Sequence, residues 1–177
     1  MTKDIEKYRA WVRQGQHSRS AAFYYLGKAI LEELGEEKGT ELIIKQVKEM
    51  GKASGTNTQN TLMKQGLNND AKHFFDRSMA PDNLYAFAWV GETTSVSEDE
   101  RFVDWKYCPI AEGFKILGDE GVKIGELFCN YIDDAVVQAY NSDYECIRES
   151  SLNLDGLCRL HFKPKDNPSL LHTVKSR

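Results

Sequence analysis

The chain has 177 residues, of which 41% are hydrophobic and 28% are charged, the composition of one ordinary globular domain. Lysine and arginine number 23 against 27 aspartate and glutamate residues, so the formal net charge is −4. These values exclude a disordered, collagen-like or coiled-coil protein, and they provide no basic surface for DNA or RNA.

The amino-terminal segment MTKDIEKYRAWVRQGQ carries charges where a signal peptide needs an apolar stretch. No later segment has the roughly 18 uninterrupted apolar residues that a transmembrane helix needs. We therefore expect a cytoplasmic protein with neither a membrane nor a nucleic-acid partner.

The first part of the sequence has the pattern of helices. Apolar residues recur at steps of three and four over residues 20–34, which predicts a helix that Gly35 ends in a left-handed conformation. The same spacing predicts a second helix over residues 41–50 that stops at Gly51. Two shorter helices are expected at 57–64 and 69–78.

The pattern changes after Pro81 from helices to strands. An apolar and aromatic segment at 84–90 and an aromatic-rich segment at 101–107 predict two strands. The polar residues 91–100 between them predict a loop.

Two further helices are expected in the second half of the chain. A short helix starts at Pro109, a residue favoured at the first helical position, and ends near Gly118. A longer helix covers residues 121–140, which have a continuous apolar stripe.

The last predicted element is a hairpin of strands at 145–154 and 157–162. Asp155-Gly156 lies between them and is a strong signal for a two-residue turn. That register places Asn153 opposite Cys158 and Ser151 opposite Leu160.

Together the elements predict an α+β fold in which helices pack on an antiparallel sheet. We expect a single domain over residues 1–177. It consists of a mainly helical part at 1–80, a mixed part at 81–163 that carries the cysteines, and a tail at 164–177.

Four cysteines, Cys108, Cys129, Cys146 and Cys158, include no CxxC or CxxH pair, so their spacing does not indicate a zinc knuckle. In a reducing compartment we expect free thiols.

Cys108 ends a predicted strand and precedes Pro109 at the start of a predicted helix. Backbone N–H groups and the helix dipole favour a thiolate at this N-cap position, so Cys108 is a candidate nucleophile. Glu112, one turn later, would raise the thiol pKa if it pointed the same way. The alternative is a small buried residue at a strand end.

Cys129 and Asp133 are four residues apart, hence on one flank of the predicted helix 121–140, whereas Asp134 points away from the apolar stripe. In a functional interpretation the thiol and the carboxylate share a pocket or bind a metal together. In the alternative, Cys129 lies at the edge of the core and Asp133 is solvated.

Strand alternation places Cys158 on one face with Leu160 and Phe162, and Arg159 and His161 on the other. Cys158 is therefore expected to point inward, either into a site or as an inert core residue.

Three segments resemble the L-2-amino-thiazoline-4-carboxylic acid hydrolase family: FVDWKYCP at 102–109, ELFCNYIDDAV at 126–136 and ESSLNLDGLCRLHF at 149–162. They match a strand ending in Cys-Pro, a helix with Cys-x-x-x-Asp, and a strand pair whose turn is followed by Cys and an aromatic residue. The resemblance implies a shared role for four side chains, Cys108, Cys129, Asp133 and Cys158.

The resemblance implies hydrolytic opening of a cyclic amidine-like ring to N-carbamoyl-L-cysteine. Water adds at the ring carbon bonded to nitrogen and sulfur, and the sulfur leaves. In one version Cys108 is the nucleophile, and Asp133 is the general base or the acceptor for the ring nitrogen proton. In a second version Cys108, Cys129 and Cys158 bind zinc.

The same resemblance calls for groups that hold the small-molecule substrate. Arg148 or Arg159 would pair with its carboxylate, and Trp105 is a further candidate for contact with it.

The order of elements is also similar to the 4-vinyl reductase type of sensing domain, some members of which hold zinc through cysteines. Ser150 stands where those sensors have a further cysteine. The rival function is thus a non-catalytic small-molecule binding or sensory domain. Its apolar ligand would lie among Phe87, Trp89, Trp105 and Phe128. A homodimer, through the sheet edge or the amino-terminal helices, is left open.

Overall fold

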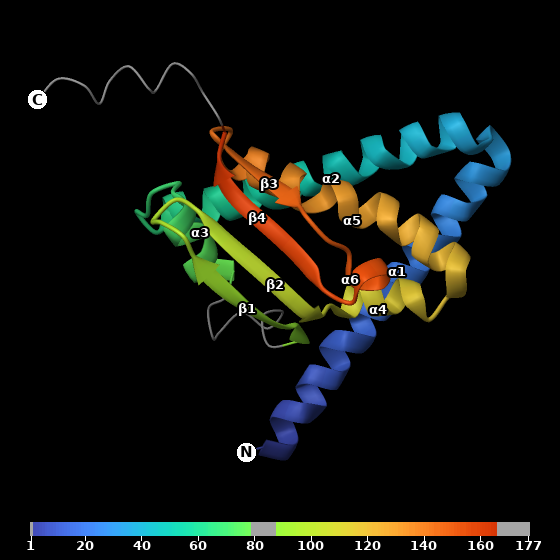
Figure 1. Cartoon of the computed structure of the whole chain (residues 1–177), viewed down its shortest axis with the longest axis horizontal. Helices are drawn as coiled ribbons and strands as arrows, with labels where there is room; N and C mark the ends of the chain where they lie inside the picture. Colours follow the sequence, from blue (N-terminus) through green and yellow to red (C-terminus); the bar gives the residue numbers. More distant parts are fainter. Residues whose placement is uncertain (1, 79–87, 166–177) are drawn as a thin grey trace, which may run out of the picture.

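The computed structural model describes residues 2–78 and 88–165. It has the α+β architecture that the sequence predicts (Figure 1). The elements in chain order are α1 (Thr2–Leu34), α2 (Glu36–Lys64), α3 (Ala71–Ser78), β1 (Val90–Ser95), β2 (Arg101–Tyr107), α4 (Pro109–Lys115), α5 (Gly118–Tyr140), β3 (Tyr144–Arg148), α6 (Leu152–Asp155) and β4 (Cys158–Pro164).

Helix α1 is longer than its apolar pattern indicates. It begins at Thr2 rather than near residue 20, and its amino-terminal half projects from the body of the molecule (Figure 1). Most residues of that half are exposed, so an apolar stripe is not needed there. Gly35 ends the helix with a φ of 78°, which confirms the predicted left-handed stop.

Helix α2 runs through Gly51, so the predicted stop at that residue and the separate helices at 41–50 and 57–64 are wrong. Gly51 serves a close approach to α5 instead. A Cβ there would lie 2.5 Å from the Cβ of Ala135, and one on Gly55 would overlap the carbonyl oxygen of Val136. The two glycines, four residues apart, therefore let α2 and α5 pack backbone to backbone.

The four strands form an antiparallel sheet in the order β1-β2-β4-β3. β1 occupies part of the predicted loop 91–100, whereas residues 84–87 of the predicted strand 84–90 lie outside the described residues. Among the described residues β1 pairs with β2 alone and lies at the edge of the sheet, and all six residues of β1 are exposed. An edge strand without a buried face has no apolar alternation, so the sequence does not reveal it.

The predicted two-residue hairpin turn is also wrong. Asp155 ends the single turn α6, and Gly156 is its left-handed cap, with a φ of 76°. The backbone N–H of Ser151 donates to the Asp155 carboxylate at 2.7 Å. Asp155-Gly156 therefore stabilises a helical turn rather than a hairpin. Residues 149–157 thus connect β3 to β4, and Leu160 pairs with Arg148.

The inner face of the sheet is covered by α3 and α5. Val103, Leu160 and Phe162 are buried there, and Phe162 stacks on Phe74 of α3 with 5.6 Å between ring centroids. A second apolar core, centred on Ile43, Val47, Phe114, Ile124 and Phe128, joins α1, α2, α4 and α5. The site described below lies where the inner face meets these helices.

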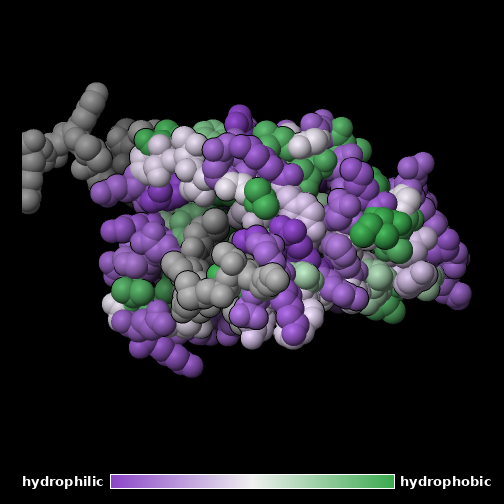
Figure 2. Space-filling view, turned by 90° about the horizontal axis from the view of Figure 1, so that it is seen from below, coloured by the Kyte–Doolittle hydropathy of each residue, from purple (hydrophilic) through white to green (hydrophobic). Residues whose placement is uncertain are grey.

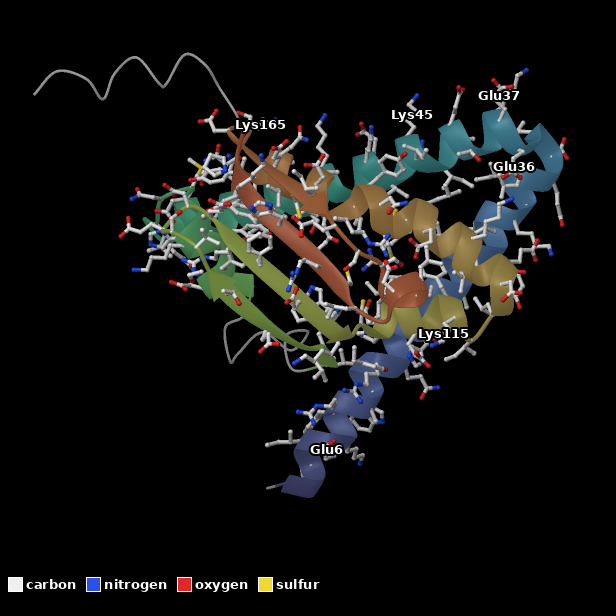
Figure 3. The ribbon with its side chains drawn as sticks, viewed as in Figure 1. Glu6, Glu36, Glu37, Lys45, Lys115 and Lys165 are labelled. Atoms are coloured by element: carbon white, nitrogen blue, oxygen red, sulfur yellow. The ribbon has the colours of Figure 1, made fainter. Side chains whose placement is uncertain are left out.

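The six charged residues labelled in Figure 3 lie at the periphery of the molecule. The face seen in Figure 2 is mostly hydrophilic, and its hydrophobic residues form separate patches. The labelled side chains of Figure 3, such as Glu6 on α1 and Lys45 on α2, point outward from their helices. Within residues 2–78 and 88–165, no helix is long and apolar enough to cross a membrane.

Candidate functional site

A cavity of about 240 Å³ lies where α4, α5 and the inner face of the sheet meet. We call it the thiol cavity because three cysteines line it. Its chemically active side chains are Cys108, Cys129, Asp133, Arg148 and Cys158. The remaining wall consists of Trp89, Trp105, Ile110, Ala111, Phe128, Ile132 and Leu152. The structure therefore brings together six of the seven site residues that the sequence predicts.

Regular secondary structure positions these side chains. Cys129 and Asp133 are one turn apart on α5, as their spacing predicts. Trp105 of β2 is the register partner of Cys158 on β4, so both side chains lie on the same face of the sheet. Cys108 is the N-cap of α4 and has extended backbone, which matches the prediction from the Cys-Pro sequence.

The thiol of Cys108 is protonated in the free protein. Burial raises its pKa, and the backbone N–H groups of Ala111 and Ile110 and the side chain of Trp89 lower it only in part. The negative charge of Asp133 adds to the increase. The expected helix-end effect is thus present, but desolvation outweighs it, so Cys108 is not a resting thiolate.

The other two thiols of the cavity are also protonated. Burial raises the pKa of Cys129 well above its usual value, and the neighbouring Cys108 thiol adds to this. Burial likewise raises the pKa of Cys158 to about 11, with a further increase from Asp133. At neutral pH the cavity therefore contains neutral sulfur atoms around one carboxylate.

That carboxylate belongs to Asp133. Burial raises its pKa from 3.8 to about 6, although Arg148 lowers it in part. Among the described residues no hydrogen bond reaches the Asp133 side chain, in contrast to Asp134, which accepts from the backbone N–H of Cys146 at 3.0 Å. A desolvated carboxylate with open acceptor sites is suited to bind a cationic ligand or to take up a proton.

Arg148 brings a positive charge to the cavity wall and is held by α5. Its guanidinium donates to Glu126 at 2.8 Å and to Asn130 at 2.7 Å. The side chains of Arg148 and Glu126 are only 8% and 16% exposed. The buried Nε of Arg148 has no hydrogen-bond partner among the described residues, which leaves a donor for a ligand.

Arg159 is the predicted site residue that does not reach the cavity. It lies on the opposite face of the sheet, as strand alternation predicts, and forms a bidentate pair with Asp104 at 2.7 and 2.6 Å. Of the two arginines proposed for a substrate carboxylate, only Arg148 lines the thiol cavity.

The three cysteines do not form a metal site in this geometry. Within the described part of the chain, no group of three or more histidine, cysteine, aspartate or glutamate side chains is arranged to hold a metal ion. The arrangement of Cys108, Cys129 and Cys158 therefore does not fit zinc binding by these three thiols.

Sequence reasoning missed Glu126, the residue that holds Arg148. Glu126, Cys129 and Asp133 are spaced by three and four residues, so they lie on one stripe of α5. That spacing is a signal for a shared wall. Of the aromatic residues proposed to enclose a ligand, Trp89, Trp105 and Phe128 line the cavity, and Phe87 lies outside the described residues.

Comparison with known proteins identifies the family of the chain and a solved structure of similar fold. Residues 15–162 match the family model described as L-2-amino-thiazoline-4-carboxylic acid hydrolase. No curated protein sequence matches the chain. The chain is similar in fold to a crystal structure of a trafficking protein particle complex subunit 3 from Naegleria fowleri covalently bound to palmitic acid. The TM-score is 0.54 and the identity 14%, over 86% of this chain and 96% of that chain.

Proposed function

The chain belongs to the L-2-amino-thiazoline-4-carboxylic acid hydrolase family, and we propose that it hydrolyses a small cyclic amidine that carries a carboxylate. The observation that supports this is the convergence of Cys108, Asp133 and Arg148 on one cavity of about 240 Å³. This volume is below the roughly 300 Å³ at which pockets for drug-sized ligands begin. The substrate is accordingly a small molecule, such as 2-amino-thiazoline-4-carboxylate.

The charges of the cavity match the two ends of such a substrate. An amidine accepts a proton and then offers N–H donors, which suit the free carboxylate of Asp133. The substrate carboxylate pairs with Arg148, whose Nε lacks a protein partner among the described residues. In this orientation we expect the ring carbon between nitrogen and sulfur to face the cysteines that line the cavity.

In the proposed reaction Asp133 takes the proton of the Cys108 thiol as the sulfur attacks that ring carbon. The bond from this carbon to the ring sulfur breaks, and the leaving sulfur receives the proton from Asp133. Water then attacks the same carbon, again with Asp133 as base. The Cys108 sulfur leaves and is reprotonated, and the product is N-carbamoyl-cysteine.

Incubation of the purified protein with L-2-amino-thiazoline-4-carboxylate tests this function. Mass spectrometry follows N-carbamoyl-cysteine, and intact-protein mass detects a covalent adduct on Cys108. We expect turnover by the wild-type protein and none by Cys108→Ala or Asp133→Asn. Asp119→Asn is the matched control because Asp119 is exposed at the start of the same helix. Equal product formation by wild-type protein and Cys108→Ala would reject the nucleophile.

A second candidate function is ligand binding without turnover. It is favoured by the raised pKa values of Cys108, Cys129 and Cys158, because protonated thiols are weak nucleophiles. The same experiment separates the two functions. A protein that binds the thiazoline in calorimetry but forms no product is a binding protein for this compound.

A further inference from the structure

A second cavity, also of about 240 Å³, adjoins the thiol cavity on the inner face of the sheet. We call it the apolar cavity because hydrophobic side chains dominate its walls, among them Phe74, Phe75, Val136 and Leu160. Among its described lining residues, Asp133 is the one with a carboxylate, and burial keeps the Cys146 thiol protonated by raising its pKa.

The two cavities share two wall residues, Trp105 and Asp133. Trp105 comes from the sheet and Asp133 from the facing helix α5, so these two side chains lie where the cavities adjoin. A ligand group that contacts the Asp133 carboxylate in the thiol cavity therefore lies beside the apolar cavity.

The apolar cavity has room for an apolar ligand group. An apolar cavity of about 150 Å³ already admits benzene, and this one has about 240 Å³. Its hydrophobic walls offer water few hydrogen bonds, so an apolar group is the matching occupant.

We propose that the apolar cavity binds an alkyl or aryl substituent of the substrate, attached to the amidine nitrogen that faces Asp133. The proposal rests on the proposed function, in which Asp133 contacts this nitrogen. The preferred substrates are thus N-substituted cyclic amidines with a carboxylate. Hydrolysis proceeds by the same bond changes and gives an N-(alkylcarbamoyl)-cysteine.

A series of 2-(alkylamino)-thiazoline-4-carboxylates with no, one, four and six carbon atoms in the chain tests this subsite. Isothermal titration calorimetry on wild-type protein gives Kd, and product formation gives kcat/KM. Burial of each methylene is expected to lower Kd, or raise kcat/KM, about fourfold until the cavity is full. A chain ending in a carboxylate should lose this gain, because it would meet Asp133 and apolar walls.

Val136→Phe fills the apolar cavity, so Kd and kcat/KM should depend less on chain length in this variant. The readout is the ratio of Kd, or of kcat/KM, between the hexyl and the unsubstituted compound, compared between variants. Cys146→Leu fills it by a smaller amount and serves if Val136→Phe does not fold. Lys123→Phe adds a ring at an exposed position of α5 and should keep the wild-type ratio.

The outcomes separate this proposal from the hydrolase itself. Binding that strengthens with chain length, without turnover of any compound, would reject the hydrolase and retain the subsite. A Kd and a kcat/KM that are both independent of chain length would overturn the subsite, whether or not the unsubstituted compound is hydrolysed. The subsite would also be overturned if Val136→Phe and Cys146→Leu both kept the wild-type ratio between the hexyl and the unsubstituted compound.

Discussion

Glu126 of α5 forms an ion pair of 2.8 Å with Arg148 at the end of β3, and Arg148 lines the thiol cavity. The same carboxylate accepts hydrogen bonds from the hydroxyl of Ser151 at 2.8 Å and the amide of Asn153 at 3.3 Å. Glu126 therefore joins the helix that carries Cys129 and Asp133 to the connection that leads into β4. Its role is to position Arg148 and to hold the cavity together.

Replacing Glu126 by glutamine should destabilise the protein, because Arg148 would remain buried without its counter-charge. The expected loss is roughly 3–5 kcal/mol in the free energy of unfolding, measured by urea denaturation. Glu92→Gln, which breaks the exposed pair with Lys106, is the control and should leave the denaturation midpoint unchanged. Similar midpoints for the two variants would contradict a structural role for Glu126.

The raised pKa of Asp133 makes stability depend on pH. Between about pH 4 and pH 6 the folded protein holds a proton that the unfolded chain has released, so stability falls as pH rises through this window. The loss is on the order of 3 kcal/mol. Urea denaturation at pH 4 and pH 7 should show this difference for wild-type protein but not for Asp133→Asn. A parallel pH dependence in both proteins would contradict a desolvated Asp133.

The protonated thiols predict slow alkylation of the free protein, in contrast to the sequence-based expectation of a reactive Cys108. Iodoacetamide labelling of Cys108 at pH 7, followed by peptide mass spectrometry, should be much slower than in denatured protein. In Asp133→Asn the pH midpoint of Cys108 labelling should move down, because the carboxylate raises the Cys108 pKa, yet this variant should form no product. An unchanged or higher midpoint in Asp133→Asn would contradict the electrostatic coupling of these two side chains.

The sequence predicted the helices that end at a recognisable glycine or start at a proline, and the strands that have one buried face. Gly35 and Pro109 mark real helix ends, and β2 and β4 follow alternation because one face is buried. The errors arose where a local signal serves a tertiary purpose. Gly51 resembles a helix stop but accommodates a neighbouring helix, and Gly156 resembles a hairpin turn but caps a helical turn.

For the site, helix spacing and strand parity predicted which side chains point inward. Strand parity placed Arg159 on the face opposite Cys158, but it did not decide between Arg148 and Arg159 as the partner of a substrate carboxylate. Spacing and parity could not reveal that β3 ends at Arg148, ten residues before Cys158, or that Glu126 meets the guanidinium. These contacts depend on the connection between the strands. Sequence position also gave the helix-end effect on Cys108 but not the desolvation that exceeds it, because burial depends on the whole fold.

Removal of metal ions should leave activity unchanged, because the described cysteines do not group as a metal site. The hydrolysis assay is run after dialysis against a chelator, with metal content measured on the same sample, and again after addition of zinc. Loss of turnover on dialysis with recovery on zinc would restore the version in which Cys108, Cys129 and Cys158 bind the ion.

The close packing of α2 on α5 gives the sharpest test of the fold, because two glycines in long helices differ in what surrounds them. A Cβ on Gly51 would lie 2.5 Å from the Cβ of Ala135 and 2.9 Å from the carbonyl oxygen of Ile132, whereas one on Gly15 would meet nothing within 4 Å. Gly51→Ala forces the helices apart, and overpacking of this kind typically costs about 1–3 kcal/mol.

Gly15→Ala, by contrast, removes only the conformational freedom of a helical glycine and should stabilise the protein by roughly 0.5–1 kcal/mol. The same substitution should thus lower stability at position 51 and raise it at position 15. Thermal denaturation of both variants measures these changes. The separation of α2 and α5 should also disturb Asp133, which lies two residues before the contact at Ala135. Gly51→Ala is therefore expected to reduce hydrolysis while Gly15→Ala preserves it, and equal Tm values for the two variants would contradict this packing.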